Sequence, residues 1–183
     1  MDSYDRGDRL GESVEHPRAI VARQLLDNLP YAAMVALGSA IFVVGIANHS
    51  LGWLLGVLYA VYGAAGALWI MVFVCPYCDF HGTNLCPCGY GRLAAKLRTK
   101  QSKGAFHKQF RKHIPVIIPL WFIPPIAGAI SLFSGFAWPV LALTLAFAGN
   151  SFVILPLVSS KYGCARCPQK DTCPWMHRIR PNP

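Results

Sequence analysis

The feature that most constrains this sequence is a pair of long stretches without any charged residue. No Asp, Glu, Lys or Arg occurs between Pro30 and Val74, and none occurs between Ile114 and Ser160. A helix on a water-soluble protein keeps one polar face toward solvent, and charged residues recur along that face. Two uncharged stretches of this length therefore predict segments that lie in a lipid bilayer.

The composition supports the same interpretation. Hydrophobic residues make up 54% of the 183-residue chain and charged residues only 14%, whereas about 25% of residues are charged in an ordinary soluble domain. A soluble protein with buried apolar helices would need amphipathic elements to cover them, and the chain offers few. The sequence therefore indicates an integral membrane protein.

Each uncharged stretch divides at a short turn into two segments long enough to approach or exceed a membrane crossing, which takes about 20 apolar residues as a helix. We predict an all-α integral membrane protein with four transmembrane helices arranged as two hairpins. The expected spans are residues 31–47, 51–74, 114–133 and 136–159. The expected organisation is an N-terminal arm (1–30), a first hairpin (31–74), a central loop rich in cysteine and basic residues (75–113), a second hairpin (114–160) and a cysteine-rich tail (161–183).

The positions of the basic residues predict the orientation. All seventeen Lys and Arg lie in the arm, the central loop and the tail, and the two short turns hold none. An even number of spans places these three segments on one side, which the positive-inside rule makes cytoplasmic. We expect a multi-pass protein of the cell's inner (plasma) membrane with both termini in the cytoplasm. The net charge of +9 then reflects topology, and nucleic acid is not an expected partner.

Proline and glycine shape the expected helices. Pro17 suits the first turn of a short amphipathic helix that reaches Pro30, and this helix either lies along the interface or extends the first span. Adjacent prolines at 124 and 125 are expected to kink or break the third span. Gly52 and Gly56 have GxxxG spacing, which allows close approach of another helix within the bundle or of a partner.

The predicted spans exclude several functions. They contain no histidine to ligate a haem, and no carboxylate or lysine to carry protons or couple ions, which argues against a b-type cytochrome and an ion-coupled transporter. The one strongly polar residue at depth is Asn150. An interhelical hydrogen bond is its expected role, and contact with a ligand or a quinone is the alternative.

All seven cysteines lie outside the predicted spans, in two patches. Cytoplasmic thiols stay reduced, so metal binding is favoured over disulfides. The loop has the spacing C-x2-C-x7-C-x-C, and the tail has C-x2-C-x5-C followed three residues later by a histidine. Each patch thus offers four ligands. The candidate metal ligands are Cys75, Cys78, Cys86, Cys88, Cys164, Cys167, Cys173 and His177.

The identity of the metal stays open between two main alternatives. Four cysteines of the chain are each followed by proline, a step common beside iron–sulfur clusters, and four thiolates can hold a cluster, for which we expect the 4Fe–4S type. Cys-Pro-x-Cys also opens many zinc sites, in which zinc would organise the loop and tail. A third interpretation, copper transport by Cys86-Pro87-Cys88, is disfavoured because this motif lies in a hydrophilic loop.

The basic segment 92–112 repeats apolar residues at helical spacing, at Leu93 and Leu97 and then at Phe106 and Phe110. It suits helices on the membrane surface with Lys and Arg at the lipid headgroups. A more specific alternative is that this segment docks an acidic soluble partner. The simplest alternative is that its positive charges only keep the loop on the cytoplasmic side of the membrane. We further expect loop and tail to form one cap on the membrane.

The leading functional prediction is a membrane subunit whose iron–sulfur clusters transfer electrons between a cytoplasmic redox protein and the membrane quinone pool or another membrane subunit. The chain has no nucleotide motif and no evident catalytic acid, base or nucleophile, so substrate chemistry would belong to a partner in an oxidoreductase complex. The alternative is a zinc-organised membrane anchor or assembly protein without redox activity.

Overall fold

The computed structural model describes residues 17–84 and 86–163, and these residues are helical with connecting turns and no strand. The α-helices are α1 (Pro17–Gly45), α2 (His49–Phe73), α3 (Tyr90–Leu97), α4 (Phe106–His113), α5 (Pro119–Ser134), α6 (Trp138–Gly149) and α7 (Leu155–Val158). Short 3-10 segments are η1 (Cys75–Tyr77), η2 (Lys103–Ala105) and η3 (Ile114–Ile117), and π-helical segments are η4 (Asn150–Ile154) and η5 (Ser159–Gly163).

Four helical segments are long and apolar enough to cross a membrane, as the sequence predicts. They are Ile20–Gly45, His49–Tyr77, Phe106–Ser134 and Trp138–Lys161. In each, less than a third of the most apolar window is buried inside the protein. Side chains this apolar that stay exposed need lipid around them, because water would make their exposure costly. Four such helices indicate a multi-pass membrane protein, and the described residues have an all-helical fold.

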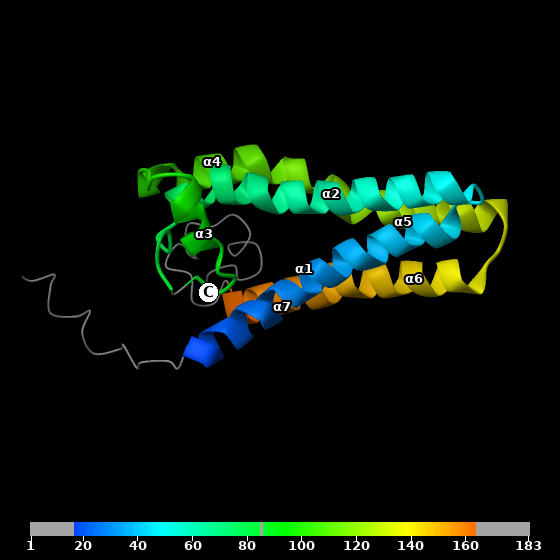
Figure 1. Ribbon diagram of the computed structural model, residues 1–183, viewed down its shortest axis with the longest axis horizontal. Coiled ribbons are helices and arrows are strands. Elements are labelled where there is room, and N and C mark those ends of the chain that lie inside the picture. Colours follow the sequence, from blue (N-terminus) through cyan, green and yellow to red (C-terminus); the bar gives the residue numbers. More distant parts are fainter. Residues whose placement is uncertain (1–16, 85, 164–183) are drawn as a thin grey trace, which may run out of the picture.

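The four segments run side by side as two hairpins (Figure 1). Both short turns, after α1 and after α5, lie at one end of the bundle, which we call the turn end. Residues 75–105 lie at the opposite end, together with the start of α1 and the end of α7 (Figure 1). We call this the loop end, and the four cysteines of the described residues, Cys75, Cys78, Cys86 and Cys88, lie in its loop.

Helix α1 runs without interruption through Pro30. The two alternatives for residues 17–30 were an interfacial helix and an extension of the first span, and the structure has one continuous helix. Its 29 residues correspond to about 44 Å of helix, which exceeds the roughly 30 Å hydrocarbon layer. Asn150 donates from Nδ2 to the Pro30 carbonyl at 2.8 Å, so the predicted interhelical hydrogen bond of Asn150 is confirmed.

Helix α5 is not broken at Pro124 and Pro125, which both lie inside it. A proline at position 124 cannot donate to the carbonyl of Leu120, four residues earlier. The hydroxyl of Tyr59 on α2 donates to that carbonyl instead, at 2.7 Å, and both residues are buried. A side chain from a neighbouring helix thus satisfies the backbone group that the proline leaves unpaired, as helices in lipid require.

Glycines on α2 bring it close to α1. A Cβ atom built on Gly56 would lie 2.9 Å from Val43 Cγ2 and 3.0 Å from the Ser39 carbonyl oxygen, and one on Gly52 would lie 2.9 Å from the Phe42 carbonyl oxygen. Real Cβ atoms do not approach so closely, so the helices could not pack at this distance with larger residues. The GxxxG pair therefore serves packing inside the bundle.

Candidate metal centre

The loop contains two tight turns, one just after α2 and one just before α3, and each begins at a cysteine. The Cys78 N–H donates to the Cys75 carbonyl at 3.0 Å, and the Gly89 N–H donates to the Cys86 carbonyl at 3.1 Å. The second turn ends at Gly89 with φ +76°, a left-handed conformation that glycine adopts without strain. Residues of the Cys-Pro-Cys-Gly motif are thus placed in one turn immediately before α3.

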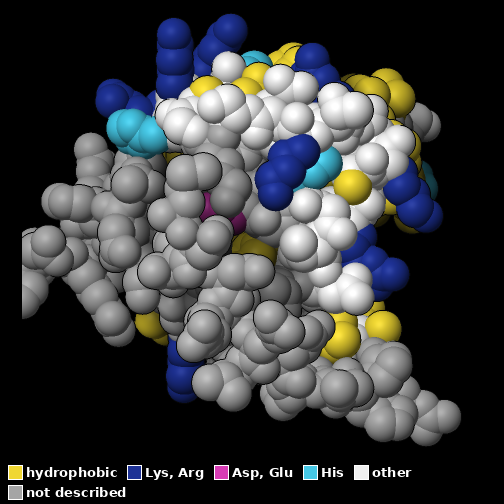
Figure 2. Space-filling model, turned by 90° about the vertical axis from the view of Figure 1, so that its left-hand side faces the viewer, with side chains coloured by type: hydrophobic (Ala, Val, Ile, Leu, Met, Phe, Trp, Pro, Cys, Tyr) yellow, Lys and Arg dark blue, Asp and Glu magenta, His cyan; other side chains and the backbone are white. Residues whose placement is uncertain are grey.

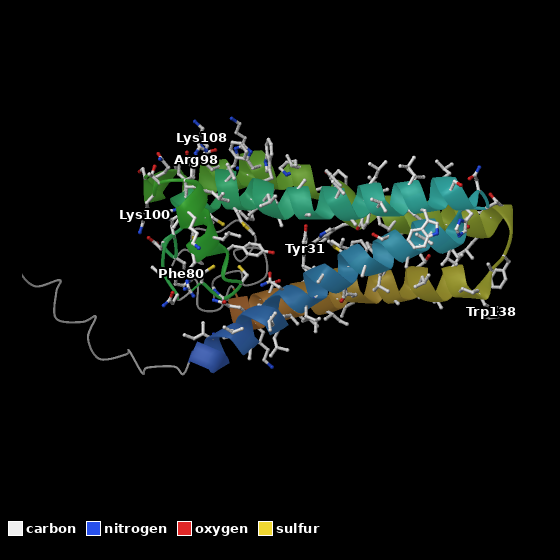
Figure 3. The ribbon with its side chains drawn as sticks, in the orientation of Figure 1. Tyr31, Phe80, Arg98, Lys100, Lys108 and Trp138 are labelled. Carbon is white, nitrogen blue, oxygen red and sulfur yellow. The ribbon has the colours of Figure 1, made fainter. Side chains whose placement is uncertain are left out.

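The two halves of the loop are held together across Gly91 at the start of α3. The Gly82 N–H donates to the Gly91 carbonyl at 3.0 Å. A Cβ atom on Gly91 would overlap the Phe80 carbonyl oxygen and approach Cys86 Cβ to 3.1 Å, so only glycine allows this contact. Phe80 lies in the loop at this end of the molecule (Figure 3). The close approach brings the segment after Cys78 against the turn that carries Cys86.

The loop is docked on the two helices of the first hairpin. Asn28 of α1 donates from Nδ2 to the Cys88 carbonyl at 2.9 Å. On the α2 side, the Gln101 N–H donates to the Pro76 carbonyl at 2.8 Å, and Arg98 Nη1 donates to the Val72 carbonyl at 3.4 Å. Asn28 thus holds the cysteine turn against α1, and the other two contacts hold the end of the loop against the end of α2 and η1.

Cys86 and Cys88 form the closest thiol pair, with their Sγ atoms 3.8 Å apart. A tetrahedral metal with thiolate bonds of about 2.3 Å has ligand atoms separated by about 3.8 Å, because the edge of a tetrahedron is about 1.6 times its centre-to-corner distance. The Gly91 N–H also donates to Cys86 Sγ at 3.3 Å. The Sγ–Sγ distance matches that of two ligands on one metal atom, and it is also the distance of a thiol–thiol hydrogen bond.

The same contacts make Cys86 the more acidic thiol of the pair. The hydrogen bond from the Cys88 thiol lowers the pKa of Cys86 to about 6, with further lowering by backbone N–H groups, of which Gly91 donates the strongest, against the opposing effect of burial. The pKa of Cys88 is raised, because its thiol donates to Cys86 and is buried. Thiolates are the metal-binding form of cysteine, so the turn prepares one ligand before any metal arrives.

The other two loop cysteines lie within electrostatic range of this pair. The Cys75 thiol interacts with Cys78 and Cys86, and Cys88 interacts with Cys75. In residues 17–84 and 86–163, however, no set of three or more His, Cys, Asp or Glu side chains is arranged closely enough to hold a metal ion. The structure thus brings Cys86 and Cys88 together and keeps Cys75 and Cys78 near them without completing a four-ligand site.

The predicted ligands of the tail, Cys164, Cys167, Cys173 and His177, lie outside the described residues. The chain that carries them leaves η5 at Gly163, and η5 packs against α1 and α7. The end of α7 lies at the loop end (Figure 1). The last described residue, Gly163, therefore lies at the end of the bundle that carries the loop cysteines.

Sequence reasoning missed three residues that position the loop: Asn28, His81 and Gly91. His81 is 8% exposed, and its Nε2 atom is hydrogen-bonded to the Arg98 carbonyl at 3.1 Å, so it ties the loop internally. Asn28 was overlooked because it lies in an amphipathic segment that also holds Arg23, Gln24 and Asp27, where one more polar residue carries no signal. Gly91 could have been noticed as the second glycine after the cysteine pair.

The loop end carries four cysteine side chains on a short loop, two of them with Sγ atoms 3.8 Å apart, and a rim of basic residues. Function must be argued from these groups and from the membrane fold that holds them. Comparisons with protein-family models, with curated proteins and with solved structures find no match for this chain.

Proposed function

We propose that this chain is an inner-membrane protein whose cytoplasmic cysteine loop and tail hold iron–sulfur clusters and transfer electrons between a cytoplasmic redox protein and the membrane quinone pool or another membrane subunit. The observation that carries the proposal is the gathering of four loop cysteines at one end of the helical bundle, with Cys75 within electrostatic range of Cys78, Cys86 and Cys88. A cluster bound there supplies a one-electron carrier.

The chain's own residues have three tasks in this function. Cys86 and Cys88 provide thiolate ligands, and Gly91 donates an N–H group to the Cys86 sulfur at 3.3 Å. Hydrogen bonds to ligand sulfurs are among the factors that set cluster potential. Asn28 holds the turn on α1 at 2.9 Å from the Cys88 carbonyl. Cys75 lies near the end of the second candidate span, His49–Tyr77, so the site begins within about 10 Å of the interface by chain reach.

The second candidate is a zinc-organised membrane anchor or assembly protein, and one observation favours it. Four cysteines shared by a 4Fe–4S cluster give each iron one thiolate, whereas a zinc ion or one iron of a 2Fe–2S cluster takes two or more. The 3.8 Å separation is the distance between two thiolates on one metal atom. In this alternative the bound zinc would hold loop and tail in one folded cap.

Anaerobic purification with metal analysis and visible absorption separates the candidates. Iron with inorganic sulfide and a visible chromophore that bleaches with dithionite supports electron transfer, whereas colourless protein with stoichiometric zinc supports the anchor. Cys86→Ser should lose the loop metal, and Ser102→Ala, an exposed change in the same loop, should keep it. Protein that binds neither metal with all seven cysteines reduced would overturn both candidates.

The proposed cytoplasmic location of both termini is tested separately. Reporter fusions at Gly11 and Asn182 should both report the cytoplasm, because an even number of spans separates them, and a tag at Ser134, where α5 ends before the second turn, should report the opposite side. A tail outside the cytoplasm would contradict the proposal, since its thiols would then be exposed to oxidising conditions.

A further inference from the structure

A group of basic side chains lies at one depth beside the aromatic residues that end α2. We call Arg98, Lys108, Arg111 and Lys112 the cation layer. All four side chains are exposed. Arg98 follows α3, and the other three lie on α4, which continues through η3 into the membrane helix α5. Figure 2, which views the loop end, shows Lys and Arg side chains projecting from it, and Figure 3 labels Arg98 and Lys108 there.

Contacts among Trp69, Phe73 and His113 join α2 to α4 at one position along the bundle, which we call the aromatic level. Trp69 Nε1 donates to His113 Nδ1 at 3.2 Å, and the ring of Phe73 lies 4.3 Å from that of Trp69 and 5.0 Å from that of His113. Tryptophan and other amphipathic aromatic rings favour the membrane–water interface. Another tryptophan, Trp53, lies sixteen residues earlier on α2, about 24 Å along the helix axis, near the turn end.

The cation layer lies just beyond this level. Phe73 is one helical turn, about 6 Å, past Trp69, and the Arg98 guanidinium carbon lies 5.7 Å from the centre of its ring. On the antiparallel α4, the three cations precede His113 by one to five residues, or about 1.5–7.5 Å of helix rise. Four positive charges therefore lie within about one and a half turns of helix from the aromatic level.

No acidic residue lies near these basic residues in the sequence. The sequence contains no Asp or Glu between Phe80 and Lys170, so α3, α4 and the segment between them are purely basic. Below the aromatic level the surface is apolar, and Leu68 and Ile118 are 50% and 47% exposed. An anion with an attached apolar group would match both parts of this surface.

We infer that the cation layer binds the headgroup of an anionic phospholipid, with Arg98 and the α4 cations at its phosphate and its acyl chains along Leu68 and Ile118. Cations near an anionic membrane surface each contribute to binding, and the Phe73 ring and the Val72 carbonyl hold Arg98 in place. An acidic soluble protein would use the charges but not the apolar surface below Trp69. The inference depends on the membrane fold and not on the proposed metal centre.

The test is native mass spectrometry of the detergent-solubilised full chain, titrated with phosphatidylglycerol and with phosphatidylcholine. We expect the unmodified protein to bind phosphatidylglycerol more tightly than phosphatidylcholine. The ratio of the two dissociation constants should fall by about fivefold for each cation removed. The variant Arg98→Gln/Lys112→Gln removes two members of the cation layer. The control Lys96→Gln/Lys100→Gln removes the same charge from exposed positions of the loop outside the layer, and Arg98→Lys should retain most of the preference.

Loss of the preference in the first double variant alone supports the site. Equal binding of the two lipids by the unmodified protein, or an equal loss in both double variants, would overturn it, because diffuse positive charge would then explain the result. A polyglutamate peptide is titrated in parallel. If it binds in an Arg98- and Lys112-dependent way while phosphatidylglycerol shows no preference, the surface docks an acidic partner and the lipid inference is wrong.

Discussion

Replacing Tyr59 with phenylalanine removes the hydroxyl that donates to the Leu120 carbonyl at 2.7 Å. That carbonyl lacks its usual helical partner because residue 124 is proline. The cost of Tyr59→Phe should therefore depend on Pro124. In a Pro124→Ala background, alanine 124 supplies an N–H group to the same carbonyl, and the hydroxyl becomes dispensable.

The size of the expected loss of stability follows from the burial of Tyr59 and Leu120. Leu120 is 1% exposed and Tyr59 5%, so no water replaces the lost donor. Interhelical hydrogen bonds in membranes average about 0.6 kcal/mol and reach about 1.7, and an unsatisfied buried group costs about 1–3 kcal/mol. We expect Tyr59→Phe to lower the free energy of unfolding by about 1–2 kcal/mol in the unmodified protein and by less than about 0.5 kcal/mol in the Pro124→Ala background.

The assay is a double-mutant cycle, with unfolding in mixed micelles followed by tryptophan fluorescence and circular dichroism. Tyr31→Phe is the matched control, because the Tyr31 hydroxyl donates to the Gly63 carbonyl at 2.8 Å and no proline lies four residues after Gly63. Its cost should be the same with Pro124 or Ala at position 124. Additive costs for Tyr59→Phe and Pro124→Ala would refute the reasoning, since the hydroxyl would then not compensate for the proline.

Three further changes test packing, the buried amide and loop docking. Gly56→Ala should lower the free energy of unfolding by about 1–3 kcal/mol in the same assay, whereas Gly149→Ala, whose Cβ would meet no atom within 4 Å, should be neutral or stabilising. Asn150→Leu should cost about 0.6–1.7 kcal/mol, and an unchanged stability would show that its bond to Pro30 contributes nothing. Asn28→Ala should speed proteolysis of the loop around Cys88 without changing the stability of the bundle, and equal cleavage rates would contradict the docking contact.

Membrane spans were predictable because their signal is chemical and local. Long uncharged stretches and two short turns define four helices without any knowledge of packing, and only their ends differ from the expected ranges. The interior of the bundle was less accessible. Pro124 and Pro125 indicate an interrupted helix when read alone, and the hydroxyl that compensates for Pro124 comes from Tyr59, sixty-five residues earlier. A local pattern does not contain that contact.

Cysteine spacing pointed to the loop thiols but not to their arrangement. The C-x-C step allowed the prediction that Cys86 and Cys88 are ligands, and the structure adds that their sulfur atoms lie 3.8 Å apart in a turn held by Gly91. Docking on Asn28 could not be predicted, because it joins residues sixty positions apart through one amide. The tail ligands Cys164 to His177 remain predictions.

The docking of the cysteine loop has a consequence for the order of biosynthesis. Hydrogen bonds from Asn28 to Cys88 and from Arg98 to the Val72 carbonyl both join the loop to residues that the ribosome makes earlier. The first hairpin can therefore receive the loop while the second hairpin is still being translated. The Cys86–Cys88 turn would then be assembled on a half-made protein, and α5 and α6 would enter the membrane beside a loop that already has its shape.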